Sequence, residues 1–300
     1  MSYEQTIRSA VECAGVGLHS GAPVRMRILP APAGTGIQFQ RTDLDGFTIE
    51  ATGRNVAKVS YATSLMKKGV LISTTEHVLS AFIGVGLDNA IVEVDNLELP
   101  ILDGSAKPIV DMVLGAGLRR QRRKRNYLRI LRPVEIREGD KYIAVVPDTR
   151  YSVSYTINFP HPMIGRETLE VDLSDGSYVT DIAPARTFGF LHEAAMLRNM
   201  GLIRGASEDN AIVLTPDGVQ NGPLRFPDEF VRHKVLDLIG DLALIGHQIL
   251  GRVVADRAGH AMHTALVSRL LKESSLTEII TLDHEAALPL LHPTAAEGRA

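Results

Sequence analysis

The segment FVRHKVLDLIGDLALIGH, residues 230–247, carries the most constraining pattern in this chain. A helix turns by roughly 100° per residue, which places four polar side chains within about one quadrant: His233, Lys234, Asp237 and Asp241. The opposite side is apolar: Val235, Leu238, Ile239, Leu242, Ile245 and Ile249. His233 and Asp237 can reach one point in space because they are four residues apart. They could hold a divalent metal ion, although a solvated polar face is the commoner explanation of such a pattern.

Chain length and charge set the broad class of protein. Three hundred residues indicate one large domain or, more often, two of ordinary size. The net charge of −3 argues against a nucleic-acid-binding protein. The exception is the basic run RRQRRKR at 119–125, which predicts a boundary between an N-terminal domain, 1–125, and a C-terminal domain, 126–300. We expect a solvated connector there, with attraction to an anionic membrane leaflet or a phosphorylated substrate as the alternative.

Cysteine content and hydropathy limit the compartment and the metal chemistry. Cys13 is the only cysteine, so neither an intrachain disulfide nor a Cys-rich zinc module is possible. Any metal ion must therefore be held by histidine and carboxylate. The first residues, MSYEQTIRSAVECAG, have charges where a signal peptide needs an apolar core, and no apolar run approaches the length of a membrane span. The sequence thus predicts a cytoplasmic protein, and nothing in it demands more than a monomer.

Strand and helix patterns follow each other irregularly. Strands are predicted at 24–29, 90–95, 127–131, 142–146 and 151–159, and helices at 75–83, 106–114, 189–199, 228–250 and 261–272. The segment 151–159 alternates between apolar and polar residues, which is typical of a half-buried antiparallel strand. Asp228 is the predicted N-cap of the longest helix. Because strands and helices do not alternate strictly, the pattern favours α+β layers over a doubly wound parallel sheet.

Two short motifs contain residues suited to proton transfer. Glu76 and His77 are adjacent in ISTTEHVLSAF, and a Glu beside a His is typical of zinc hydrolases, in which the His binds metal and the Glu accepts a proton. The chain has no HExxH motif, and helix starts often carry Glu for electrostatic reasons. His260 follows Gly259 before a predicted helix and suits a general acid, with His263 as the competing residue. A surface histidine is the alternative.

Three further motifs are weak individually. PARTFGF contains Thr187, whose hydroxyl could donate to an oxyanion. In the same motif, Phe188 and Phe190 could line an apolar passage or simply fill the core. The glycine-rich GVGLHSG, with His19, could approach a phosphate, but it lacks the GxGxxG pattern. LDGSA, residues 102–106, more simply begins a helix.

In combination these motifs are specific. Six of them occur in one order over nearly the whole chain: GVGLHSG, TTEHVLSA, LDGSA, ARTFGF, HKVLDLIGDL and AGH. The chain therefore closely resembles the UDP-3-O-acyl-N-acetylglucosamine deacetylases of lipid A biosynthesis, over about residues 3–290. The resemblance implies two α+β domains, each a layered sheet-and-helix sandwich, with the active site between them. It also implies one catalytic zinc ion and a UDP-linked acylated amino sugar from which acetate is released.

The same resemblance implies roles for individual residues. The zinc ligands would be His77, His233 and Asp237. The catalytic residues would be Glu76 as general base, His260 as general acid, Asp241 orienting His260, Thr187 at the oxyanion and Lys234 close to the substrate. The residues around the sugar, the metal and the acyl passage would be Leu18, His19, Ser64, Phe188 and Phe190. The basic run and the tail after Leu291 are not assigned by the resemblance.

Elementary metal chemistry agrees with amide hydrolysis. Two histidines and one carboxylate leave a tetrahedral zinc ion with one open position, although such ligands also suit Fe²⁺ or Co²⁺. One alternative to the deacetylase function is a metal-dependent amidohydrolase acting on another acylated sugar. A second is a binding module that holds an anionic partner through the basic run, with steep salt dependence. A lipid-bearing substrate also implies transient contact with the inner membrane surface.

Overall fold

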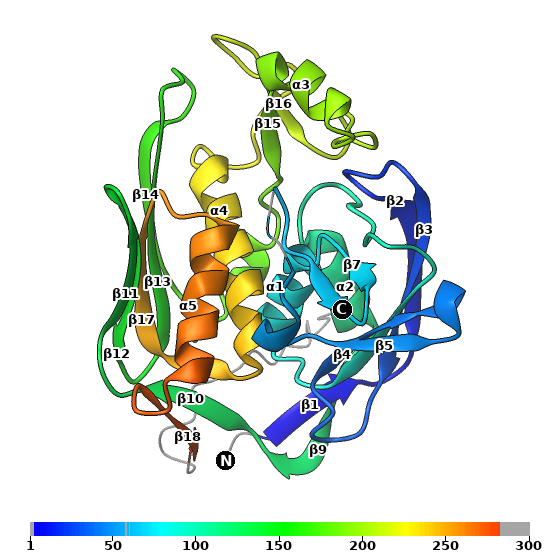
Figure 1. Ribbon diagram of the computed structural model, residues 1–300, viewed down its shortest axis with the longest axis vertical. Helices are drawn as coiled ribbons and strands as arrows, with labels where there is room; N and C mark the ends of the chain where they lie inside the picture. Colours follow the sequence, from blue (N-terminus) through cyan, green and yellow to red (C-terminus); the bar gives the residue numbers. More distant parts are fainter. Residues whose placement is uncertain (1–2, 58, 60, 283–300) are drawn as a thin grey trace, which may run out of the picture.

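The computed structural model describes residues 3–57, 59 and 61–282 and has a layered architecture (Figure 1). One sheet lies on each outer side of the molecule, and the longer helices lie between the two sheets. These helices are α1 (Glu76–Val85), α2 (Lys107–Ala116), α4 (Glu229–Leu242) and α5 (His260–Lys272). This arrangement confirms the predicted α+β class. Among the described residues, no helix combines the length and apolar content needed to cross a membrane.

The N-terminal sheet has five strands in the order β2-β3-β8-β4-β5. Their bounds are Val11–Val16, Pro23–Pro30, Ala90–Val94, Ile37–Arg41 and Phe47–Glu50, respectively. Only β4 and β8 are paired in parallel; the other neighbours are antiparallel. Val24, Met26 and Ile28 of β3 alternate with exposed residues and belong to the hydrophobic core. The strands predicted at 24–29 and 90–95 are therefore confirmed as β3 and β8.

The C-terminal sheet has seven strands, with β17 at its centre. The path β11-β12-β17-β10-β18 has the bounds Val134–Glu138, Lys141–Pro147, Gln248–Asp256, Asn126–Ile130 and Thr277–Thr281. Two further strands, β13 (Tyr151–Phe159) and β14 (Gly165–Asp172), extend from β17. The prediction for 151–159 is correct for its pairing with β14, which is antiparallel, but β13 runs parallel to β17. Val153, Tyr155 and Ile157 of β13 are buried in the core.

The basic run is a strand and not a connector. Residues Leu118–Lys124 form β9, which pairs antiparallel with β1 (Tyr3–Ile7). The Gln121 side chain points inward and donates to the Ala31 carbonyl. The expectation of a connector is therefore wrong for this segment, because backbone pairing with β1 holds it in place, although most of its side chains are exposed to solvent. A domain division at residue 125 stays a prediction.

Two predicted helices differ from the structure. α4 ends at Leu242, a 3₁₀ turn covers Ala243–Ile245, and β17 begins at Gln248, so the helix predicted at 228–250 is too long. Gly246 lies in the left-handed region, with φ +84°, where glycine is favoured and a helix ends. Asp228 occupies the N-cap position as predicted, but its carboxylate accepts from Arg232 and makes no capping bond.

The helix predicted at 189–199 is correct for residues 194–199 but begins too early. The segment contains β15 (Phe188–Phe190), a 3₁₀ turn (Leu191–Glu193) and only then α3 (Ala194–Asn199). β15 pairs in parallel with β16 (Ile212–Leu214), and the two project with α3 at the top of the molecule in Figure 1. The remaining elements are the β6–β7 hairpin (Leu65–Lys67 and Val70–Ile72), 3₁₀ turns at Thr42–Leu44 and Gly53–Asn55, and a π-helical turn at Tyr178–Ile182.

A close contact between α1 and α4 determines where the polar residues meet. A Cβ atom at Gly240 would lie 2.0 Å from the Glu76 carbonyl oxygen, so only glycine lets the two helices approach this closely. The start of α1 is thereby brought beside the polar side of α4. On that side His233, Asp237 and Asp241 are all at most 2% exposed. The helical pattern thus marks a buried polar interface and not a solvated face.

Candidate active site

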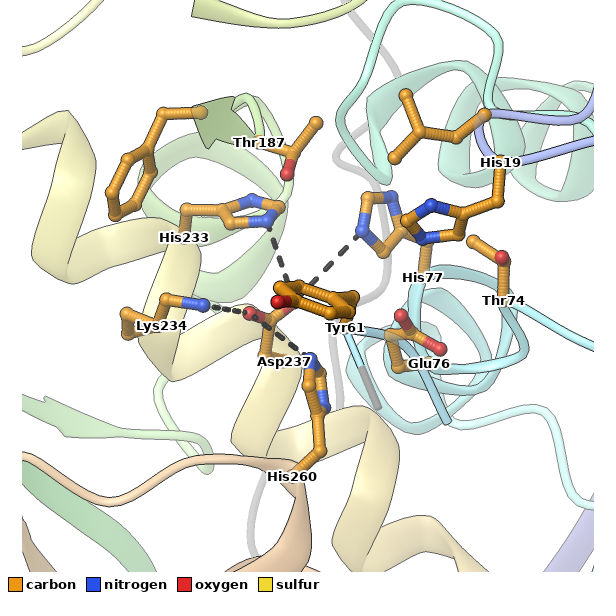
Figure 2. A pocket seen from close by; sticks show the side chains of 12 residues that line it. His19, Tyr61, Thr74, Glu76, His77, Thr187, His233, Lys234, Asp237 and His260 are labelled. Atoms are coloured by element: carbon orange, nitrogen blue, oxygen red, sulfur yellow. Dashed lines mark hydrogen bonds and ion pairs between the residues drawn. The ribbon is translucent and has the colours of Figure 1, made fainter. Parts of the chain in front are cut away.

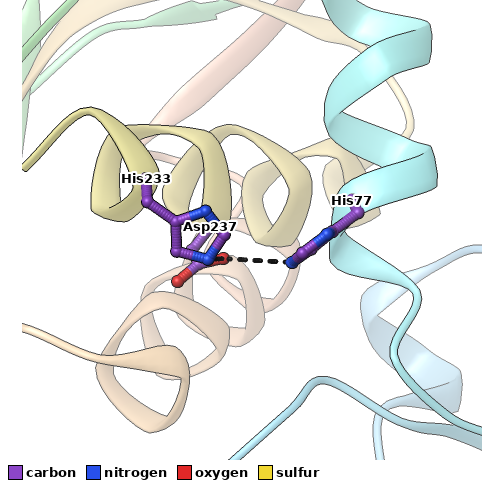
Figure 3. A group of neighbouring side chains, drawn as sticks. All are labelled: His77, His233 and Asp237. Atoms are coloured by element: carbon purple, nitrogen blue, oxygen red, sulfur yellow. Dashed lines mark ion pairs between the residues drawn. The ribbon is translucent and has the colours of Figure 1, made fainter. Parts of the chain in front are cut away.

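Three side chains converge between the start of α1 and the middle of α4. His77 lies on α1, while His233 and Asp237 are one turn apart on α4 (Figure 3). Each offers one ligand atom, and these atoms all lie within 4.8 Å of one another. Asp237 Oδ1 is 3.3 Å from His233 Nε2 and 3.8 Å from His77 Nε2. The fold therefore assembles the set that the resemblance implied, from segments more than 150 residues apart.

The donor chemistry of this group fits a divalent cation. His233 Nδ1 lies 3.1 Å from the Ala185 carbonyl oxygen, which can only accept, so the proton belongs on Nδ1 and Nε2 is left with a lone pair. Burial, followed by the charge of His233, lowers the pKa of His77 to about 3. Both imidazoles are therefore neutral, and His233 turns an acceptor atom toward the Asp237 carboxylate. Acceptors facing one another in a buried space are stable together when a metal ion lies between them.

Glu76 lies beside this group at the start of α1 (Figure 2). The Thr63 backbone N–H donates to its carboxylate at 3.1 Å. Burial raises the pKa of Glu76 to about 8; the charge of His260 acts in the opposite direction, and Asp241 and Asp237 add to the increase. Such a carboxyl group can exchange a proton near neutral pH, which suits a general base.

His260, the first residue of α5, faces the same space from the other side (Figure 2). Its Nδ1–H donates to Asp241 Oδ2 at 2.7 Å, and its Nε2 lies 3.9 Å from Asp237 Oδ2. Burial opposes the charged form, but the charge and hydrogen bond of Asp241, followed by Asp237 and Glu76, raise the pKa of His260 to about 9. His260 is thus a cation at neutral pH, the state that a general acid needs.

All these groups open into one cavity of about 190 Å³. Every residue that the resemblance assigned lines this cavity except Asp241, Ser64 and Phe190. Lys234 is half-buried at the rim; its Nζ donates to Asp237 Oδ2 at 2.8 Å and lies 5.5 Å from the centre of the Phe188 ring.

The three exceptions lie nearby in different ways. Asp241 lies behind His260, fully buried. The Ser64 hydroxyl donates to Ser73 at 2.9 Å and does not line the cavity. Phe190 belongs to an aromatic group that continues from the cavity wall, with its ring centre 6.5 Å from that of Phe188 and 5.8 Å from that of Phe159.

The glycine-rich loop at 15–21 is fastened by a buried carboxylate. Glu98 accepts the backbone N–H groups of His19 and Ser20, at 2.8 and 2.7 Å, and also the Thr74 hydroxyl. A Cβ at Gly17 would lie 2.3 Å from Glu98 Oε2, so glycine is required for this approach. The loop thus presents Leu18 and His19 to the cavity, and neither ring nitrogen of His19 has a hydrogen-bond partner among the described residues.

Sequence reasoning missed several residues of this site. Tyr61 and Thr74 line the cavity, and both have positive φ values, +62° and +59°. Thr63 joins two parts of the site, because its N–H donates to Glu76 and its hydroxyl donates to Asp241. No motif in the sequence marks Tyr61, Thr63 or Thr74 as site residues. Threonine and tyrosine occur throughout proteins, and only the fold brings these three to the site. His263, set aside as the competitor of His260, is fully buried and donates to Asp241.

The fold and the site together define a metal-dependent hydrolase: a two-histidine, one-carboxylate group lies beside a buried glutamate and a cationic histidine. Comparison with known families agrees, because the family described as UDP-3-O-acyl N-acetylglycosamine deacetylase matches residues 4–272. The chain belongs to this family.

Two relatives extend over almost the whole chain. One, named UDP-3-O-acyl-N-acetylglucosamine deacetylase, from Solibacter usitatus, is 54% identical over 288 residues, which cover 96% of this chain and 97% of the relative. A protein of the same name from Anaeromyxobacter sp. is 44% identical over 300 residues, with 98% of each chain covered. The family assignment therefore applies to both sheets and to all the helices that form the site.

Proposed function

We propose that this protein is a zinc-dependent deacetylase that removes the N-acetyl group from UDP-3-O-acyl-N-acetylglucosamine, releasing acetate, in lipid A biosynthesis. The observation that carries the proposal is the convergence of His77, His233 and Asp237 on one point, with Glu76 and His260 in the same cavity. The names of the family and of both relatives agree with it.

The metal site would hold zinc through His77, His233 and Asp237. A bound zinc ion would polarise the acetamide carbonyl and lower the pKa of a water molecule to about 7. Histidine and carboxylate ligands also accept Fe²⁺ or Co²⁺, so the proposal of zinc rests on the family resemblance, and elemental analysis tests it. The Ala185 carbonyl, which accepts from His233 Nδ1, would keep the ring oriented for binding.

Glu76 and His260 divide the proton transfers between them. The Glu76 carboxylate would accept a proton from the attacking water molecule, and the nearby metal charge would favour its ionised form. The amine is a poor leaving group and must be protonated as the C–N bond breaks. His260 carries that proton at neutral pH because Asp241 raises its pKa to about 9. The two groups come from different helices, α1 and α5, and both line the cavity beside the metal group (Figure 2).

Thr187 and Lys234 would act on the substrate itself. Both line the cavity beside the metal group. The Thr187 hydroxyl can donate to the oxygen of the carbonyl as it gains negative charge. Lys234 would add a positive charge at the rim, where its ammonium group already lies against Asp237 and above the Phe188 ring.

The remaining parts of the substrate have matching surroundings. A second cavity, of about 310 Å³, shares Tyr61 and His260 with the first. It contains Lys141, whose charge suits a diphosphate, and Arg257, which already pairs with Asp140 and Asp256. Leu18 and His19 would border the sugar. The aromatic group around Phe188 and Phe190 would border the 3-O-acyl chain. A cytoplasmic location, a monomeric state and brief contact with the inner membrane surface belong to the same proposal.

The test combines elemental analysis with an assay of acetate release. We expect one zinc ion per chain and acetate release from UDP-3-O-acyl-N-acetylglucosamine, lost on chelation and restored by adding metal. The same sugar nucleotide without the acyl chain should be a much poorer substrate. If metal-replete protein releases no acetate, the proposal is wrong. If it deacetylates both substrates equally well, the protein is a less selective amidohydrolase.

A further inference from the structure

A chain of buried polar groups lies behind His260. It runs from Tyr155 on β13 through His263 on α5 to Asp241 on α4, and all three residues are 0% exposed. His263 Nδ1 is 2.8 Å from Asp241 Oδ2, and its Nε2 is 3.2 Å from the Tyr155 hydroxyl. Buried polar groups are costly unless they are paired, so this arrangement needs an explanation beyond packing.

The contacts of Asp241 indicate what His263 does. The Thr63 hydroxyl donates to Oδ1, while His260 and His263 both donate to Oδ2 through their Nδ1–H groups, at 2.7 and 2.8 Å. Without the hydrogen bond from His263, Oδ2 would accept from His260 alone. The carboxylate could then rotate together with the His260 ring and would no longer orient it. Three donors from two segments, Thr63 and the first turn of α5, instead fix the carboxylate plane.

Tyr155 adds a restraint on the backbone before His260. Its hydroxyl donates to the Ala258 carbonyl at 2.6 Å, two residues before His260. The preceding residue, Arg257, has a φ of +51°, which is unusual for a residue with a side chain. One hydroxyl on β13 therefore contacts both the segment that carries His260 and the ring that steadies Asp241.

We propose that His263 is a positioning residue for the deacetylation. By donating Nδ1–H to Asp241 it fixes the carboxylate that orients His260. Tyr155 packs edge to face against the His263 ring and holds the 257–259 segment through its hydrogen bond to Ala258. This inference rests on the proposed function for its catalytic part. The contacts themselves can be tested without any turnover.

Two amide substitutions separate positioning from packing. In His263→Asn the amide nitrogen takes the place of Nδ1 and can still donate to Asp241, whereas in His263→Gln it takes the place of Nε2 and faces Tyr155 instead. We expect His263→Gln to lower kcat by about 10–100-fold, with KM and metal content unchanged. We expect His263→Asn to retain kcat within about threefold, because it keeps the essential hydrogen bond. His247→Gln, at a half-buried histidine outside this chain of contacts, serves as the control.

The imidazole N–H resonances provide a readout that does not depend on activity. In protein labelled with ¹⁵N-histidine, the Nδ1–H of His260 should give a downfield signal that persists in His263→Asn and broadens or shifts in His263→Gln. If wild-type protein lacks deacetylase activity, the proposed function fails while this test still stands. If both variants keep wild-type kcat and the same His260 signal, or if both lose kcat equally, His263 only fills the core and the inference is wrong.

Tyr155→Phe tests the same chain of contacts from its far end. The substitution removes one hydroxyl and keeps the ring in the core, so folding should be preserved. We expect kcat to fall by roughly two- to tenfold, less than in His263→Gln, because the bond from His263 to Asp241 remains. A kcat equal to that of wild type in Tyr155→Phe would remove Tyr155 from the inference, and a loss larger than in His263→Gln would contradict the assigned order of contacts.

Discussion

Two groups with the same composition lie side by side in this site and differ in what they can bind. One consists of His77, His233 and Asp237, and the other of Asp241, His260 and His263. In the second, both histidines direct Nδ1–H to the carboxylate. In the first, the Nδ1–H of His233 donates a hydrogen bond to the Ala185 carbonyl, and its Nε2 lone pair faces Asp237.

The difference shows that proton direction, and not the residue types, separates a cation site from a proton-handling site. A carboxylate that already accepts hydrogen bonds from two imidazoles is satisfied without a metal ion. Asp237 accepts one hydrogen bond, from Lys234 to Oδ2, and its Oδ1 faces the lone pair of His233, an arrangement that a bound cation balances. This contrast leads to predictions in which the first group controls metal binding and the second controls the acid.

The largest effect is expected from His233→Ala. Removing one of three ligands should reduce the metal content from one ion per chain to almost none. Acetate release should fall by more than the roughly 100-fold that loss of an outer-shell partner can cost. Elemental analysis with circular dichroism as a check on folding measures this, and His263→Asn is the matched control. Stoichiometric metal in folded His233→Ala would show that the first group is not the metal site.

The next largest effect is expected from Glu76→Gln. The amide keeps the size of the side chain and can still accept from the Thr63 N–H, but it cannot take a proton. We expect kcat to fall by about 10²–10⁴-fold while metal content stays at the wild-type level. Loss of metal in this variant would instead place Glu76 among the ligands.

Much of the fold and the site could be predicted from the sequence. Apolar alternation gave β3, β8 and β13, and the helical pattern gave α1, α4 and α5, because these elements repeat one simple period over their length. The ends were less predictable. The apolar pattern continues past Leu242, although the chain turns at Gly246 and re-enters as β17. Periodicity cannot distinguish such a turn from one more helical turn.

The functional residues of the site could be predicted better than the residues that hold them in place. Short motifs located the residues that could bind metal or move protons, but not the groups that hold them. Thr63 joins Glu76 to Asp241 through one backbone N–H and one hydroxyl, and no residue type signals this. The periodicity of α4 favoured a solvated polar face, which is wrong because α1 covers that face at Gly240. Burial of this kind is a property of tertiary packing and cannot be read from one helix.

A smaller effect, mainly on pH dependence, is expected from Asp241→Asn. The carboxylate raises the pKa of His260 to about 9, so the protonated acid is present below that pH and is lost as the pH rises through it. Asp241→Asn removes the charge, so the pKa of His260 should fall and the alkaline decline of kcat should begin at lower pH. We expect kcat near neutral pH to fall by about 10–100-fold. A pH–rate profile with an unchanged alkaline limb would contradict the role given to Asp241.

The smallest effect is expected when the second group is altered in the cobalt-substituted protein. The electronic spectrum then tests whether Asp241 and His263 are separate from the metal ligands. Co²⁺ accepts the same histidine and carboxylate ligands and reports its ligand geometry through its absorption bands. Asp241→Asn and His263→Gln should leave these bands unchanged, because neither residue belongs to the metal group. His77→Ala should alter or abolish them. A shift of the absorption bands in Asp241→Asn would contradict this expectation. It would mean that Asp241 affects the ligands of the ion, so that the two groups are not separate sites.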